Sequence, residues 1–112
     1  MNVGSAAAVM GVPGDAAYAA GKAALIGLSR SVARELGPRN ITCNVVLRGI
    51  IDTGMTGDVR GDVQAEIVGR VPAGRMGAEQ EVAHIVGALM ADEAGCVNGA
   101  VVPVDGGLSM GW

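Results

Sequence analysis

The sequence predicts an α/β fold in which a parallel sheet of about three strands is flanked by helices. Short apolar segments alternate with helical patterns along the 112 residues. This alternation is typical of strand–helix–strand units with right-handed crossovers. Half of the residues are hydrophobic and 17% are charged, which is too apolar for a disordered chain.

The first half of the chain begins with a short strand and a long helix. Residues 1–3 read as the end of a strand, residues 4–14 as a loop, and Asp15 as the N-cap of the helix. The helix is expected over Ala16–Leu36, because apolar residues recur there along one face. That face consists of Leu25, Leu28, Val32 and Leu36.

Beyond the helix, a glycine followed by a proline signals its end. Gly37 is expected to take the left-handed conformation of a helix cap, and Pro38 cannot continue the helix. Residues 40–47 are rich in β-branched side chains and predict a buried strand. The remaining elements are expected to be a loop over 48–57, a weak helix or lid over 59–69, a loop over 71–77, a helix over 78–91 and a strand over 100–104.

Composition excludes several classes of function. The net charge is −3 and no basic run occurs, which argues against binding to a nucleic acid backbone. No segment is long and apolar enough to span a membrane, and no signal peptide is evident. Cys43 and Cys96 have neither metal-binding nor redox spacing, so we expect two buried, reduced thiols in a cytoplasmic protein.

Two further groups of polar residues favour ordinary surface positions. Asp58, Asp62 and Glu66 recur at every fourth position, which predicts a solvated acidic helix face rather than a metal site. His84 falls outside the apolar stripe of its helix and is expected to face solvent.

Tyr18 and Lys22 carry the first chemical signal. They are four residues apart, so their side chains lie on one face of the predicted helix. An ammonium group beside a phenol favours the phenolate, which suits a proton donor to a developing alkoxide near neutral pH. Ser5 lies thirteen residues upstream of Tyr18, at the end of the first strand. Open α/β sheets build their ligand clefts at such strand ends.

Around these residues the sequence resembles the short-chain dehydrogenases/reductases. The matching segments are NVGSAAAVMG, YAAGKAALIGLSRSVARELGPRNITCNVV, RGIIDTGMT, VPAGRMGAEQEVA and GAVVPVDGGLSMG. Within that family the sequence is most similar to bacterial, especially actinobacterial, 3-oxoacyl-[acyl-carrier-protein] reductases. The resemblance implies a partial Rossmann-like, doubly wound fold, with residues 1–112 as a single partial domain and the N-terminal cofactor-binding half missing.

The resemblance also implies roles for individual residues. Ser5 would polarise the substrate carbonyl, Tyr18 would protonate its oxygen, and Lys22 would favour the Tyr18 phenolate and bind the nicotinamide ribose. The cofactor would be NADP(H) or NAD(H). The residues that match its contacts are Tyr18, Lys22, Arg48, Gly49, Ile51 and Thr53, and Met55 would begin the substrate-binding loop.

Three departures from the family pattern stand out. Arg48 replaces a proline beside the nicotinamide, and Gly21 replaces a serine between Tyr18 and Lys22. In addition, no glycine-rich loop between a strand and a helix is present to bind the pyrophosphate.

By resemblance the chain is an NADPH-dependent reductase that converts 3-oxoacyl thioesters to 3-hydroxyacyl thioesters in fatty acid synthesis, and it is expected to need its missing half. Two alternatives stay open: an inactive fragment that keeps only assembly surfaces, and a reductase of another ketone or alcohol. Expected partners are an acyl-carrier-protein-linked or other carbonyl substrate, and a homo-oligomer or an N-terminal half. The first strand is expected to expose an apolar edge that favours self-association.

Overall fold

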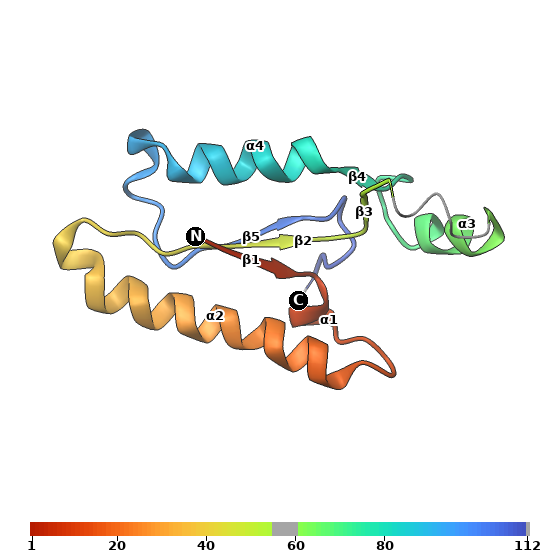
Figure 1. Ribbon diagram of the computed structural model, residues 1–112, viewed down its shortest axis with the longest axis horizontal. Coiled ribbons are helices and arrows are strands. Elements are labelled where there is room, and N and C mark those ends of the chain that lie inside the picture. Colours follow the sequence, from red (N-terminus) through yellow and green to blue (C-terminus); the bar gives the residue numbers. More distant parts are fainter. Residues whose placement is uncertain (55–60, 112) are drawn as a thin grey trace.

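The centre of the computed structural model, which describes residues 1–54 and 61–111, is a three-stranded parallel sheet (Figure 1). Its strands are β1 (Asn2–Ser5), β2 (Val45–Arg48) and β5 (Val101–Val104), in the order β1–β2–β5. All neighbours run parallel, so the predicted α/β fold with three parallel strands is confirmed.

The middle strand, β2, forms the core of the sheet. Val45, Val46 and Leu47 are each 0% exposed. Successive side chains of a strand point to opposite faces, so both faces of β2 must be covered. Figure 1 shows the cover: α2 (Ala16–Leu36) lies on one side of the sheet and α4 (Glu79–Met90) on the other.

The positions of these helices correct one prediction. Both connections, β1 to β2 and β2 to β5, step across the sheet in the same direction, yet α2 and α4 lie on opposite faces. The two crossovers therefore have opposite hands, and the expectation that both are right-handed is wrong for one of them. The second connection is long, and it includes β3 (Ile51–Asp52), α3 (Gly61–Gly69) and β4 (Gly77–Ala78) before α4 begins.

Helix α2 has the predicted bounds but packs on the sheet through small residues. Ser29 is 1% and Ala33 8% exposed, whereas Leu28 is 53% exposed. The Asn2 side-chain amide of β1 donates to Ser29 Oγ at 2.8 Å and ties the helix to the sheet edge. Small side chains let the helix approach the sheet closely. Of the apolar stripe, Leu28 is exposed, whereas Leu25, Val32 and Leu36 are half-buried. Asp15 occupies the N-cap position, but its side chain makes no capping hydrogen bond.

The end of α2 differs from the prediction in detail. Gly37 keeps right-handed helical angles (φ −51°) and opens a 3-10 helix, η1 (Gly37–Arg39). The left-handed residue is Asn40, with φ 60°. Strand β2 starts five residues later than predicted, because Cys43 pairs with the turn before β5: its N–H donates to Asn98 Oδ1, and its carbonyl accepts from Gly99.

Several short elements fall in segments predicted to be loops. Residues Ala7–Met10 form one turn of helix, α1, and the two-residue strands β3 and β4 pair in parallel as a separate small sheet. The expected weak helix is present as α3 (Gly61–Gly69). The predictions for Met55, Asp58 and Val59 fall outside the described residues.

Helix α4 behaves as predicted. Its residues Glu79 and Glu81 lie in the first turn, and Glu81 Oε2 accepts from the Ala78 N–H at 2.8 Å. Arg75 binds the same carboxylate through both terminal nitrogens, at 2.7 and 2.8 Å. His84 is exposed, as expected.

The structure also bears on the expectations for the two cysteines, for metal or membrane binding, and for the edge of the sheet. Cys43 is buried as expected, but Cys96 is exposed, which corrects the prediction of two buried thiols. Within residues 1–54 and 61–111 no group of potential metal ligands gathers, and no described helix has the length and apolarity needed to cross a membrane. β1 is an edge strand, and Val3 is 45% exposed there, so the predicted apolar edge is confirmed.

Candidate functional site

The candidate site lies where β1 and β2 end side by side. The strand register places Ser5 opposite Arg48, the last residue of each strand. The Ala6 N–H donates to the Arg48 carbonyl at 2.9 Å and continues this pairing one residue further. Ligand clefts of open α/β sheets form at the carboxyl ends of the strands, which is the edge where these residues lie.

The serine hydroxyl is held by the turn that follows β1. Ser5 Oγ accepts a hydrogen bond from the Ala7 N–H at 3.2 Å, at the start of α1. A hydroxyl can accept and donate at the same time, so this contact leaves its proton free. Ser5 can therefore donate to a ligand oxygen that lies just beyond the strand end.

Tyr18 and Lys22 sit on adjacent turns of α2, as their spacing predicts. Lys22 Nζ lies 5.8 Å from the centroid of the Tyr18 ring. The same ammonium group donates to the Val3 carbonyl of β1, at 3.4 Å. This bond orients Lys22 between the helix and the sheet edge, and brings a positive charge close to the phenol.

A pocket of about 270 Å³ joins these elements. Ser5, Tyr18, Arg48 and Gly49 all line it, so the structure brings together one strand end, one helix and the loop after β2. Its apolar lining residues are Ala6, Ala7, Met10, Val12, Pro13, Ile50 and Leu108. The volume lies close to the lower end of the usual range for small-molecule sites, roughly 300–1,000 Å³.

The remaining predicted residues lie beside this pocket rather than in its wall. Lys22 reaches Tyr18 from the next helical turn. Ile51 is 7% exposed and belongs to β3, where it is paired with Gly77. Thr53 follows β3 and is exposed. Of the residues matched to cofactor contacts, only Tyr18, Arg48 and Gly49 line the pocket.

Among the lining residues that the sequence did not predict, two come from segments distant from both Ser5 and Tyr18. Arg70 comes from the loop after α3, and Leu108 from the turn after β5. The Leu108 turn has a local signal in the Asp-Gly-Gly run: Asp105 Oδ1 accepts from the Gly107 N–H at 2.9 Å. Arg70 has no comparable signal, because only folding brings it near β2.

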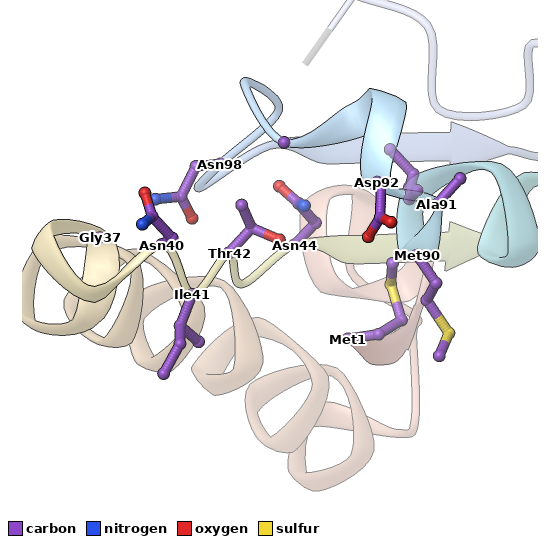
Figure 2. Close-up of a pocket in the computed structure, with 12 residues that line it drawn as sticks. Met1, Gly37, Asn40, Ile41, Thr42, Asn44, Met90, Ala91, Asp92 and Asn98 are labelled. Atoms are coloured by element: carbon purple, nitrogen blue, oxygen red, sulfur yellow. The ribbon is translucent and has the colours of Figure 1, made fainter.

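A larger pocket, of about 520 Å³, lies at the opposite, amino-terminal edge of the sheet (Figure 2). Its polar wall includes Asn44 and Asn98, whose side-chain amides are occupied in holding the chain. Asn44 donates to Val97 and accepts from Ala100, and Asn98 accepts from Cys43. The polar side chains of this pocket therefore hold the chain segments together, and the candidate site is the pocket at Ser5.

Comparison with known proteins finds one family model and a set of bacterial reductases. Residues 1–109 match a family model described as enoyl-(acyl carrier protein) reductase. The 3-oxoacyl-[acyl-carrier-protein] reductase of Escherichia coli (strain K12) is 47% identical over 110 residues, which are 98% of this chain and 45% of that protein. The Pseudomonas aeruginosa reductase of the same name is 46% identical over 110 residues, 98% of this chain and 44% of that protein.

The mycobacterial relatives give the same picture. The corresponding reductase of Mycobacterium tuberculosis (strain ATCC 25618 / H37Rv) is 45% identical over 109 residues, 97% of this chain and 44% of that protein. The chain thus spans less than half the length of the curated relatives it matches.

Proposed function

Since the chain belongs to the short-chain dehydrogenase/reductase family, we propose that residues 1–112 are the catalytic part of an NADPH-dependent reductase of 3-oxoacyl thioesters. One observation carries this proposal: Ser5 and Tyr18, from different elements, line a single pocket, with the Lys22 ammonium group 5.8 Å from the Tyr18 ring.

The proposed mechanism assigns one task to each of the three residues. The Ser5 hydroxyl donates a hydrogen bond to the carbonyl oxygen of the substrate and holds this oxygen beside Tyr18. Tyr18 gives its phenolic proton to this oxygen as negative charge develops on it. The Lys22 ammonium group, 5.8 Å from the centre of the Tyr18 ring, attracts the negative charge left on the phenol oxygen after the proton transfer.

The cofactor fits this edge of the sheet only in part. Gly49 lines the pocket at the end of β2, and Tyr18, Lys22 and Arg48 lie around the same strand ends, so these residues would hold the nicotinamide end. When bound, the cofactor supplies the hydride. The sequence contains no strand–glycine-rich loop–helix segment for a pyrophosphate. We therefore propose that a second polypeptide, or a longer form of this one, completes the cofactor site.

A second candidate is an assembly subunit without activity of its own. Two exposed apolar features favour it: Leu28, 53% exposed on the outer face of α2, and Val3, 45% exposed on the edge strand. Either surface fits contact with another copy of the chain or with an amino-terminal half.

The test is NADPH oxidation with an acetoacetyl thioester. It is run on the chain alone and on the chain co-expressed with the amino-terminal part of the Escherichia coli relative. We expect activity in the second sample. Tyr18→Phe should lower the rate about 10²–10⁴-fold, since it removes the proton donor.

Matched serine variants separate catalysis from folding. Ser5→Ala should lower the rate about 10²–10³-fold, the usual effect of losing one donor to the reacting oxygen. Ser31→Ala, at an exposed position of α2, should leave the rate unchanged. Activity that survives in Tyr18→Phe would refute the mechanism. A complementing pair that forms a stable complex but never turns over would favour the assembly subunit.

A further inference from the structure

The turn formed by residues 105–109 connects the end of β5 to the candidate site. Figure 1 shows the chain after β5 turning back toward α1, and Leu108 of this turn lines the pocket at Ser5. The Gly106 carbonyl accepts a hydrogen bond from the Ala73 N–H at 3.0 Å. The 105–109 turn therefore forms part of the pocket wall and also holds the loop between α3 and β4 in place.

The same turn lies directly against Gly49, just beyond the end of β2. A Cβ on Gly49 would be 2.6 Å from the Asp105 Cα, so the two backbones approach very closely. The Gly49 N–H donates to the Val104 carbonyl at 3.0 Å and joins the ends of β2 and β5. Gly49 lines the pocket and is one of the residues proposed above to hold the nicotinamide end of the cofactor. The position of Asp105 therefore limits the position of a residue of the site.

One side chain, the carboxylate of Asp105, holds the shape of this turn. Its Oδ1 accepts from the Gly107 N–H at 2.9 Å, and its Oδ2 accepts from the Ser109 N–H at 3.0 Å. The Ser109 hydroxyl, in a residue that is 3% exposed, donates to the same Oδ2. The backbone needs this support, because Gly106 and Gly107 have positive φ angles of 63° and 90° and a glycine alone prefers no single conformation.

We propose that Asp105 is a positioning residue for the nicotinamide end of the cofactor. Asp105 does not line the pocket at Ser5, so it acts through its neighbours. Its carboxylate keeps the 105–109 turn folded, and the turn keeps Gly49 and Leu108 at their places in the pocket wall. The inference rests on the proposed function and adds to it a residue that contacts neither the substrate nor the cofactor.

The probe for the test is reduced nicotinamide mononucleotide. It carries the nicotinamide end of the cofactor and lacks the adenosine part and the pyrophosphate, for which this chain has no glycine-rich loop. Its binding to the ¹⁵N-labelled chain is measured by NMR through the amides of Ser5, Gly49 and Leu108. This readout needs no turnover, and the spectra without probe report the positions of the same amides.

Asp105→Asn changes one oxygen of the carboxylate into an N–H₂ group, which cannot accept from an N–H donor. We expect this variant to bind the probe about fivefold more weakly, the effect of losing about one hydrogen bond. Without probe, the amides of Gly49 and Leu108 should shift. Ser109→Ala is the milder variant, because it removes only the hydroxyl bond to Asp105, and it should weaken binding about twofold. The double variant should bind as Asp105→Asn does, because both changes act on one turn.

Two controls separate positioning from stability. Asp92→Asn makes the same chemical change at an exposed position of η3 (Asp92–Ala94), and it should leave binding unchanged. Asn44→Ala weakens the fold from the opposite edge of the sheet and lies outside the pocket at Ser5. In samples that circular dichroism shows to be folded, Asn44→Ala should bind the probe as the parent does.

Four results would overturn the inference. They are parent-like affinity in both Asp105→Asn and Ser109→Ala, unchanged amides of Gly49 and Leu108 in Asp105→Asn, an equal loss of affinity in Asn44→Ala, and no binding of the probe to the parent chain. If Asp105→Asn does not fold, Ser109→Ala decides. The proposed function is tested by turnover in Tyr18→Phe and this inference by binding to the chain alone, so either can fail without the other.

Discussion

Gly49 is the position where a single added carbon should damage the fold most. An alanine Cβ there would lie 2.6 Å from both Cα and Cβ of Asp105, and 3.3 Å from its carbonyl carbon. Such atoms cannot swing aside as the end of a long side chain can. The Gly49 N–H also donates to the Val104 carbonyl at 3.0 Å, which fixes the distance between the ends of β2 and β5.

The cost of Gly49→Ala follows from these contacts. Overpacking in a tight site costs about 1–3 kcal/mol. If β5 moves away to relieve the clash, the hydrogen bond to Val104 is strained or lost, and its net contribution is about 0.5–1.5 kcal/mol. We therefore expect the free energy of unfolding to fall by about 2–4 kcal/mol, a large share of the stability of a small domain.

A chemically identical change elsewhere provides the control. Gly21 lies inside α2, and an alanine Cβ there would meet no atom within 4 Å. Gly21→Ala should therefore raise the free energy of unfolding by about 1 kcal/mol, because alanine is the better helix former. Urea unfolding followed by circular dichroism should show the two midpoints moving in opposite directions with equal slopes.

Two results would refute this reasoning. A Gly49→Ala chain within about 0.5 kcal/mol of the parent would mean that β2 and β5 do not approach as closely as described. A destabilised Gly21→Ala chain would mean that this face of α2 is covered in solution.

Two further predictions concern polar contacts. Asn44→Ala should lower the free energy of unfolding by about 2–4 kcal/mol in the same urea assay, because it leaves two backbone groups of the 97–100 turn without their buried partner; a loss below about 0.5 kcal/mol would contradict this. The Arg75 guanidinium lowers the pKa of Glu81 from 4.5 to about 2, so this pair contributes stability above pH 4.5 that is lost as the pH falls toward 2. Arg75→Gln should raise the pKa of Glu81, as measured by NMR titration of its carboxyl group. An unchanged pKa in this variant would refute the ion pair between Arg75 and Glu81.

Local pattern was enough to predict the main elements. The bounds of α2 and the presence of three strands followed from apolar periodicity and from the glycine and proline signals at their ends. The spacing of Tyr18 and Lys22 placed them on one helix face, and they contact each other. Each of these predictions depends on residues close together in the chain, where helix and strand geometry alone fix which side chains are neighbours.

Local pattern failed where two distant segments meet. The apolar stripe of α2 predicted the helix but not which of its residues are buried: Ser29 and Ala33 are buried, and Leu28 is exposed. Strands β3 and β4 have only two residues each and no pattern of their own, and they exist because they pair with each other.

The sequence by itself therefore determined the main helices and strands, their order, and the serine, tyrosine and lysine of the candidate site. The tertiary structure decided that α2 and α4 cover opposite faces of the sheet, and that Arg70 lies in the same pocket as Arg48. The physical reason is the sequence separation over which each effect acts. Backbone geometry and apolar periodicity act over a few residues, whereas the packing of a helix on a sheet depends on side chains separated by tens of positions.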